Sequence, residues 1–206
     1  MQSVTLLPVA KTFEAAAVRE VIVAGARCCA ENYVHEALEK MRALADLRDR
    51  IEWHLIGPLQ SNKTRAVAEA FDWVHSVDRS KTAERLSEQR PPVLGALQLC
   101  LQVNISGEAS KSGVSPEHAA ALADAVAKLP NVRLRGLMAI PEPAGDFEAQ
   151  RQPHRALREL LEALNRHGHR LDTLSMGMSA DLEAAIAEGT TIVRVGTAIF
   201  GARERA

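Results

Sequence analysis

The chain has few aromatic residues and few cysteines. Aromatic side chains make up 3% of its 206 residues, and only three cysteines occur. An odd number of cysteines, with Cys28 and Cys29 adjacent, does not form a disulfide framework. We therefore interpret Cys28, Cys29 and Cys100 as reduced thiols inside strands, as in a cytosolic protein. Ligands at metal-type spacing are also lacking, so the sequence predicts no metal site.

The chain also lacks an excess of charge of one sign and any long apolar run. Its 25 basic and 26 acidic residues give a formal net charge of −1, and the basic residues form no block. This distribution excludes a strong field for nucleic acid or an anionic membrane. No apolar run reaches the roughly 18 residues of a membrane span. No basic segment precedes the short apolar run near the start, so we predict no signal peptide and a cytoplasmic location.

What the sequence does contain is a regular alternation of short apolar runs and helical patterns. The expected strands cover residues 4–10, 27–30, 52–56, 73–77, 97–105 and 132–139, with two more after Leu171 and before Gly196. The expected helices cover residues 13–24, 34–47, 62–71, 80–89 and 147–166, with others opening at Ser115 and near Ser179 or Asp181. Thr12 and Ser61 are expected to cap the helices that follow them.

Eight strands separated by seven helices predict a parallel sheet with helical crossovers. An open doubly wound sheet and a closed barrel both fit this order. No G-x-G-x-x-G follows the first strand, and eight repeats in about 200 residues suit a compact barrel. We therefore predict an α/β fold, a single (β/α)8 TIM-type barrel, in which all strand C-terminal ends share one face. The residues expected there include Lys11, Asn32, Asp78, Asn104, 175–178 and 194–197.

The stretch from Leu171 to Gly201 has the features of a phosphate-binding site at two neighbouring strand ends. Gly177 and Gly196 let a ligand approach backbone N–H groups. In the same two turns, Ser175, Ser179 and Thr197 add hydroxyl donors. Phosphate often binds after strands 7 and 8 of such barrels. The alternative, in which these are ordinary turn residues, remains open from spacing alone.

Lys11 is the lysine expected directly at the end of a strand. One interpretation is a solvated side chain; the other is a lysine that forms a Schiff base with an aldehyde. A free amine of pKa ~10.4 is neutral in only about 0.04% of molecules at pH 7, so the second interpretation needs desolvation or a nearby cation. Arg194, an isolated charge between apolar residues, is a candidate for that cation, or else for a salt bridge at the rim.

Several motifs occur together and in one order along nearly the whole chain. They are V-A-K-T at 9–12, E-N-Y-V-H-E at 31–36, W-H-L-I-G-P-L-Q-S-N-K at 53–63, H-S-V-D-R at 75–79, K-S-G at 111–113, G-L-M at 136–138, S-M-G-M-S-A-D at 175–181 and R-V-G-T-A-I-F-G at 194–201. On these motifs the chain resembles the pyridoxal 5'-phosphate (PLP) homeostasis protein family, which is related in fold to the barrel domain of alanine racemase.

The resemblance implies a set of cofactor-binding residues and no catalytic residue. Lys11 is expected to hold PLP as a Schiff base, with Asn32 near the ring and Arg194 facing the pyridine nitrogen. The phosphate is expected to be held by the residues of the two glycine turns, Ser175, Met176, Gly177, Gly196 and Thr197. Residues 1–206 are expected to form a single PLP-binding barrel domain.

Three functions are compatible with such a site. The first is a PLP carrier that acts in PLP homeostasis and passes the cofactor to apo-PLP enzymes; the second is a PLP-dependent amino-acid racemase; the third is a phosphosugar isomerase or aldolase without PLP. A racemase needs an acid and a base on opposite faces of the substrate. Tyr33, the one tyrosine, is expected beside a strand end and not on a lid. We therefore predict a carrier, without robust catalysis, that is a monomer.

Two departures from the family pattern affect these expectations. Cys29 and Ala30 stand where the family usually has Phe-Gly, so the turn there is expected to differ slightly. Only about three residues precede the first strand, where the family usually has a helix. Either the start site is misassigned or trimmed, or the fold lacks that helix and exposes an apolar strip beside the first and last strands. Reduced stability and self-association through this strip are the expected consequences.

Overall fold

Eight parallel strands form the centre of the molecule. The computed structural model describes residues 3–107 and 112–201. Within this part the strands are β1 (Thr5–Pro8), β2 (Cys28–Glu31), β3 (Glu52–Leu55), β4 (Trp73–Val77), β5 (Leu97–Gln102), β6 (Val132–Met138), β7 (Thr173–Ser175) and β8 (Ile192–Val195). Their order in the sheet is β1-β8-β7-β6-β5-β4-β3-β2.

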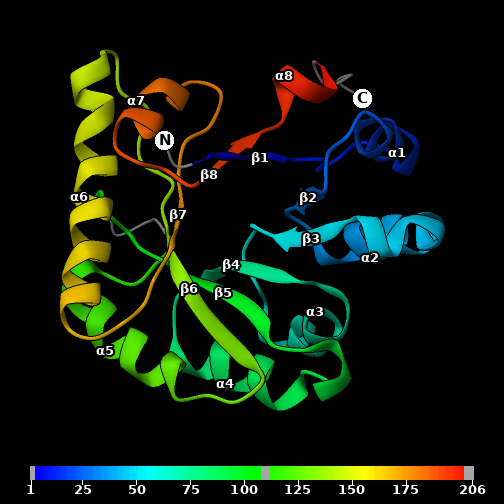
Figure 1. Cartoon of the computed structure of the whole chain (residues 1–206), viewed down its shortest axis with the longest axis horizontal. Coiled ribbons are helices and arrows are strands. Elements are labelled where there is room, and N and C mark those ends of the chain that lie inside the picture. Colours follow the sequence, from blue (N-terminus) through cyan, green and yellow to red (C-terminus); the bar gives the residue numbers. More distant parts are fainter. Residues whose placement is uncertain (1–2, 108–111, 202–206) are drawn as a thin grey trace.

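Helices connect successive strands and surround them on the outside (Figure 1). The α-helices are α1 (Ala15–Val23), α2 (Val34–Ala43), α3 (Thr64–Ala70), α4 (Ser80–Gln89), α5 (Pro116–Ala127), α6 (Phe147–Arg166), α7 (Leu182–Ala187) and α8 (Thr197–Phe200). The described ranges also contain the short 3-10 helices η1 (Ala45–Arg50), η2 (Ser61–Lys63) and η3 (Pro92–Leu94).

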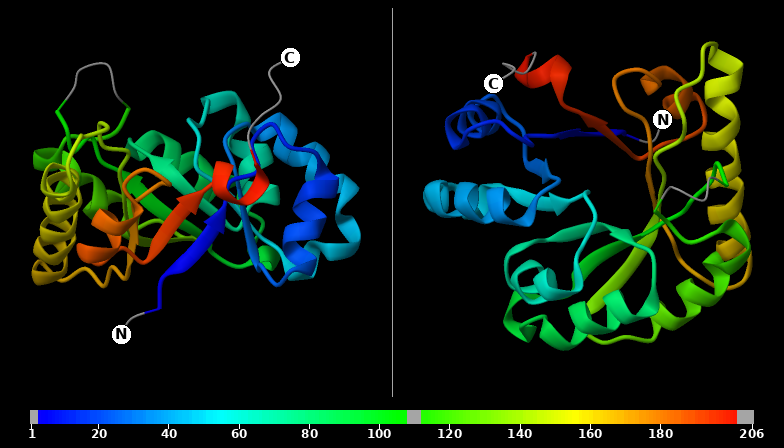
Figure 2. Two further views of the ribbon diagram at one scale, coloured as in Figure 1. Left: turned by 90° about the horizontal axis from the view of Figure 1, so that it is seen from above. Right: turned by 180° about the vertical axis from the view of Figure 1, so that it is seen from behind.

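The sheet closes on itself almost completely. β1 pairs in parallel with β8, and the two arrows lie side by side in Figure 2. On its other side β1 meets β2 through the bridge between Val9 and Ala30 and the hydrogen bond from Ala10 N to Ala30 O, which is 2.9 Å long. This nearly closed ring of eight strands with helices outside confirms the predicted TIM-type barrel.

Some helix boundaries differ from the expected ones. Thr12 does not cap α1: its φ of 69° and its N–H bond to the Glu36 carboxylate place it in a turn, and α1 starts after Glu14. Likewise, Ser61 lies in η2, and α3 starts only at Thr64. The expected helix 34–47 ends at Ala43 and continues as η1, while α8 was not predicted because it is a single turn.

The core has two layers separated by the barrel wall. A large cluster joins strand residues to helix residues such as Val18, Ile22 and Ala37. Two smaller clusters contain residues from the strands and from the positions directly after β1 and β3, and no helix residue. Their members are Leu7, Val9, Cys28, Ala30, Ile192 and Ile56 in one, and Trp73, Cys100 and Met138 in the other. Because side chains alternate between the two faces of a strand, these two clusters fill the barrel interior.

An apolar strip is exposed beside β1 and α1. The side chain of Leu6 is 52% exposed and that of Val23 is 67% exposed, and a groove between β1, α1, β2 and α8 includes Leu6, Val21 and Ile199. This agrees with the strip expected from the sequence. None of the helices in the described ranges is long and apolar enough to cross a bilayer.

Candidate functional site

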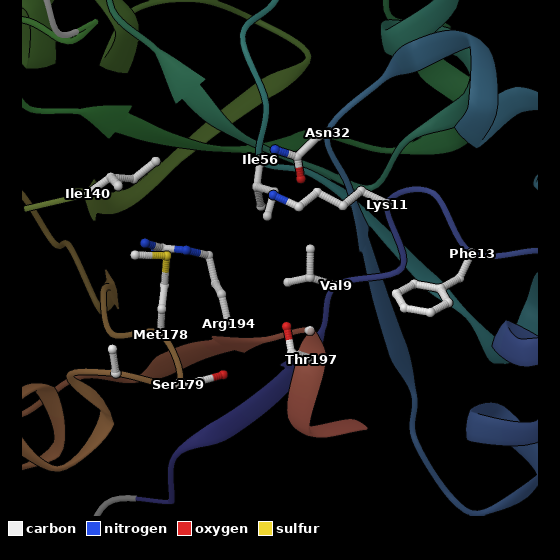
Figure 3. Close-up of a pocket in the computed structure, with 12 residues that line it drawn as sticks. Val9, Lys11, Phe13, Asn32, Ile56, Ile140, Met178, Ser179, Arg194 and Thr197 are labelled. Atoms are coloured by element: carbon white, nitrogen blue, oxygen red, sulfur yellow. The ribbon is translucent and has the colours of Figure 1, made fainter. Parts of the chain in front are cut away.

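A cavity of about 400 Å³ opens at the C-terminal ends of the strands. Its lining comes from several loops and strand ends and is shown as sticks in Figure 3. The lining residues are Val9, Lys11, Phe13, Asn32, Ile56, Ile140, Met178, Ser179, Ala180, Arg194, Gly196 and Thr197. Lys11 and Thr197 therefore lie at the same end of the barrel, as the fold prediction required.

Lys11 enters the cavity from the turn that follows β1. The backbone on its N-terminal side is fixed, because Ala10 N bonds Ala30 O at 2.9 Å and Ala10 O accepts a 2.6 Å hydrogen bond from Lys40 Nζ. On the other side, Thr12 N donates to the Glu36 carboxylate at 3.1 Å. The lysine thus projects from a backbone held on both sides, and Figure 3 shows its side chain extended across the cavity beside Asn32.

A buried ion pair lies directly behind this turn. Lys40 Nζ is 2.7 Å from Glu31 Oε1, with 9% and 0% of the two side chains exposed. Burial raises the pKa of Glu31 to about 7, against the opposing effect of the hydrogen bond and charge of Lys40. Because Lys40 also binds the carbonyl of Ala10, the pair ties the end of β2 to the end of β1. The pair stabilises the backbone that leads into Lys11, and neither of its residues lines the cavity.

Asn32 contributes a polar group without a partner. Its Oδ1 is buried and has no hydrogen-bond partner in the described structure. A buried acceptor without a hydrogen-bond partner is unusual, and it indicates an atom that is available to bind a ligand. Asn32 is held by a close approach of Gly57, since a Cβ at Gly57 would overlap the carbonyl oxygen and Cα of Asn32. Only glycine fits at position 57, which explains the glycine in that motif.

The turn after β7 carries Met178 and Ser179 to the cavity. Asp181 holds it, because Asp181 Oδ1 accepts from Met178 N at 2.7 Å and Oδ2 lies 3.0 Å from Nε2 of the buried His154 on α6. Burial alone would raise the pKa of Asp181, but the hydrogen bonds from His154 and Met178 outweigh it and keep this pKa below its usual value. The carboxylate therefore remains ionised and fixes the turn to α6.

Arg194 lies in the floor of the cavity and is 4% exposed. Its Nη1 donates to Ser175 O at 2.6 Å and to Ser175 Oγ at 2.9 Å, and its Nη2 donates to Ala139 O at 2.9 Å. Burial lowers its pKa to about 10, with a partly compensating effect of Asp181. The guanidinium is therefore still charged at neutral pH, and it is bound to the barrel interior instead of forming the salt bridge at the rim considered above.

The structure brings together five of the eight residues predicted to bind a cofactor. Lys11, Asn32, Arg194, Gly196 and Thr197 line the cavity. The other three, Ser175, Met176 and Gly177, are buried and do not line it. Ser175 bonds Arg194 inside the barrel, whereas Met176 packs in the core cluster shared by strands and helices. Position 177 requires a glycine because its φ is +94° and because a Cβ there would overlap the Cβ of Ala185. Packing therefore explains this glycine without any contact to a ligand. The prediction for these three residues remains untested.

The apolar part of the lining and the buried polar residues behind it could not be predicted from the sequence. Val9, Phe13, Ile56 and Ile140 line the cavity, but apolar residues next to strand ends carry no distinguishing pattern. His54, His75 and Asp78 occur in quoted motifs or at a strand end, yet only the fold reveals which of them face inward. The three cysteines are free and buried, as expected, and burial raises the pKa of each of them.

The barrel and this cavity define the class of protein to which the chain is similar. The family model for the N-terminal domain of alanine racemase matches residues 1–204. A pyridoxal phosphate homeostasis protein of Pseudomonas aeruginosa is 63% identical over 202 residues, which cover 98% of this chain and 86% of the relative. One of Vibrio cholerae is 54% identical over 204 residues, covering 98% and 86%.

A solved structure agrees with these sequence matches. PipY of Synechococcus elongatus PCC7942, solved with PLP bound, superimposes with a TM-score of 0.89 at 39% identity and covers 98% of this chain and 94% of its own. The chain belongs to the pyridoxal phosphate homeostasis protein family.

Proposed function

We propose that this chain binds PLP on Lys11 as a Schiff base and acts in PLP homeostasis by holding the cofactor and releasing it to apo-PLP enzymes. The observation that carries the proposal is a lysine that projects from a fixed turn into a cavity, in a chain 39% identical to a protein solved with PLP bound. The chemistry that PLP supplies is that of its aldehyde, which condenses with an amine and loses water.

The residues present fit PLP. Lys11 supplies the amine, and the unmatched Oδ1 of Asn32 supplies a polar contact near it. The hydroxyl groups of Ser179 and Thr197 also line the cavity and can donate hydrogen bonds to a phosphate. Gly196, which has no side chain, leaves its backbone accessible to the same group. The volume of about 400 Å³ is within the range of small-ligand sites. The resemblance also implies a phosphate role for Ser175, Met176 and Gly177, and none of these three residues lines the cavity.

The lining argues for a carrier and against a racemase. Lys11 can act as acid or base on one face of a substrate. Tyr33 is 54% exposed and does not line the cavity, and the remaining polar groups among the described lining residues are amide, hydroxyl and guanidinium groups. Arg194 is permanently charged and, placed at the pyridine nitrogen, disfavours protonation of the ring. This reduces the capacity of the cofactor to stabilise a carbanion.

Absorption spectroscopy and chemical trapping test the binding proposal. We expect the purified protein, loaded with PLP, to show the visible band of a Schiff base. Reduction with borohydride followed by peptide mass spectrometry should place the label on Lys11. Lys11→Ala should lose the band, whereas Lys81→Ala, which removes an exposed lysine on α4, should keep it.

The racemase alternative makes the opposite prediction in solvent exchange. With alanine or serine in deuterium oxide, the loaded protein should exchange the α-hydrogen no faster than free PLP. Stereoselective exchange that disappears in Lys11→Ala would contradict the carrier proposal and assign the chain to the enzymes. A label found on another lysine, with no effect of Lys11→Ala, would contradict the assignment of Lys11.

A further inference from the structure

A line of buried hydrogen bonds crosses the barrel interior and ends on Arg194. His54 Nδ1 on β3 is 2.9 Å from His75 Nε2 on β4, and His75 Nδ1 is 2.8 Å from Ser175 Oγ on β7. Ser175 Oγ then accepts from Arg194 Nη1 on β8 at 2.9 Å. β4 and β7 are not neighbours in the sheet, so the bond between His75 and Ser175 spans the inside of the barrel. All four side chains are buried.

We propose that His75 is a positioning residue for Arg194, acting through the hydroxyl of Ser175. The proposal rests on the proposed binding of PLP in the cavity that Arg194 lines. Nη1 and Nη2 of Arg194 are held by Ser175 and by the carbonyl of Ala139. The side chain of Ser175 is in turn held by His75, so the histidine determines the direction of the serine hydroxyl. Through that hydroxyl it fixes the orientation of the Arg194 guanidinium towards a ligand in the cavity.

The direction of the hydrogen bonds along this line follows from counting protons. Both histidines are fully enclosed, and burial lowers the pKa of His54 to about 3 and that of His75 well below its usual value, so both rings are neutral. Arg194 can only donate to Ser175 Oγ. The serine proton then goes to Nδ1 of His75, and Nε2–H of His75 donates to Nδ1 of His54.

The opposite direction is less favourable. It would have His75 Nδ1 donate to Ser175, which leaves the serine proton without an acceptor and Nε2 of His54 without a donor. In the first arrangement the single unmatched group is Nε2–H of His54, an atom without a partner in the described structure. One unmatched buried group costs less free energy than two. Each residue therefore donates its hydrogen bond to the next one in the order Arg194, Ser175, His75 and His54.

With this direction, His75 Nδ1 accepts a hydrogen bond from Ser175. Two amide variants of His75 test this, because only one of them keeps an acceptor at that position. In His75→Asn, the amide oxygen takes the position of Nδ1 and still accepts from Ser175. In His75→Gln, the amide group reaches the position of Nε2 and the acceptor for Ser175 is lost. The two variants are similar in polarity, so a general loss of packing would affect both.

Dissociation of PLP from the loaded protein distinguishes them. We expect His75→Asn to keep the dissociation rate and the pH profile of the visible band of the wild-type protein. We expect His75→Gln to release PLP about tenfold faster, which corresponds to the loss of one hydrogen bond between neutral groups. Ser175→Ala should match His75→Gln, and the double variant should add nothing. Equal effects of Asn and Gln, or additive effects with Ser175→Ala, would overturn the proposal.

A measurement without PLP separates this proposal from the proposed function. In ligand-free protein labelled with nitrogen-15 in histidine, we expect the NMR shifts of His75 to show Nδ1 without a proton and Nε2 with one. The reverse tautomer would overturn the positioning role even if PLP binds as proposed. Conversely, the expected tautomer in a protein that fails to trap PLP on Lys11 would contradict the proposed function alone.

Discussion

Thr197 is the residue whose contribution to ligand binding is simplest to isolate. It lies in the exposed rim of the cavity, and its side chain is shown beside Val9 in Figure 3. We predict that Thr197→Ala weakens retention of PLP by roughly 1–3 kcal/mol, the value of a hydrogen bond to a charged group. Thr197→Ser keeps the hydroxyl and should retain PLP like the wild-type protein. Equilibrium dialysis measures both, and equal affinities in all three proteins would contradict a role in phosphate binding.

Glu31 makes stability depend on pH. Its pKa is about 7 in the folded protein against a reference value of 4.5, so the folded state binds the proton more tightly. A raised carboxyl pKa removes stability as the pH rises from about 4.5 to about 7, and the effect is constant above that window. We therefore predict that wild-type protein loses stability from pH 5 to pH 7 relative to Glu31→Gln.

Urea unfolding at the two pH values measures this difference. Glu69→Gln, which alters an exposed carboxylate on α3 paired with Arg65, is the control and should follow the wild-type profile. Parallel profiles for the wild-type protein and Glu31→Gln would contradict the raised pKa.

At the scale of elements, the contact between β6 and β7 depends on Gly136. A Cβ at this position would overlap the carbonyl group of Thr173 on the neighbouring strand. We predict that Gly136→Ala destabilises the protein by about 1–3 kcal/mol or more, because two paired strands must move apart. Gly145→Ala is the control, since a Cβ there meets no atom within 4 Å. Thermal unfolding compares them, and equal melting temperatures would be inconsistent with this packing.

The sequence predicted whole elements better than their ends. β4, α4 and α6 match the expected ranges to the residue, because each is delimited by charged, proline or capping residues. At Thr12 and Ser61, however, the tertiary structure overrides the capping preference: Thr12 N is bound by Glu36 from the next helix, and Ser61 begins a 3-10 turn. A contact between distant segments has no local signal.

The same limit applies to the site. Glycines, a lysine and hydroxyl residues at strand ends predicted the location of the cavity, since parallel strands bring these ends together. The inward direction of His75, and its bond to a serine 100 residues away, could not be predicted, because one residue of difference in register reverses the face of a strand side chain. The inward direction of Ser175 on β7, where it bonds Arg194, follows from the same alternation.

At the scale of the whole molecule, we expect the exposed strip at Leu6 and Val23 to be the surface through which copies of the chain would associate. Isolated exposed apolar side chains are common in monomers, and we expect a monomer at low micromolar concentration. Any association at higher concentration should begin at this strip and should decrease in Val23→Lys. Sedimentation velocity tests this, and a stable dimer at low micromolar concentration, unaffected by Val23→Lys, would contradict the expectation.

Transfer of PLP to an apo-enzyme tests the account most directly. The loaded protein, freed of excess PLP, is mixed with an apo-PLP enzyme in the presence of a phosphatase that destroys free PLP, and the recovered activity is followed. The account predicts recovery with the wild-type protein beyond that given by an equal amount of free PLP, and none beyond it with Lys11→Ala prepared in the same way. Recovery no greater than with free PLP, or equal recovery with Lys11→Ala, would contradict the proposal that this chain carries PLP on Lys11.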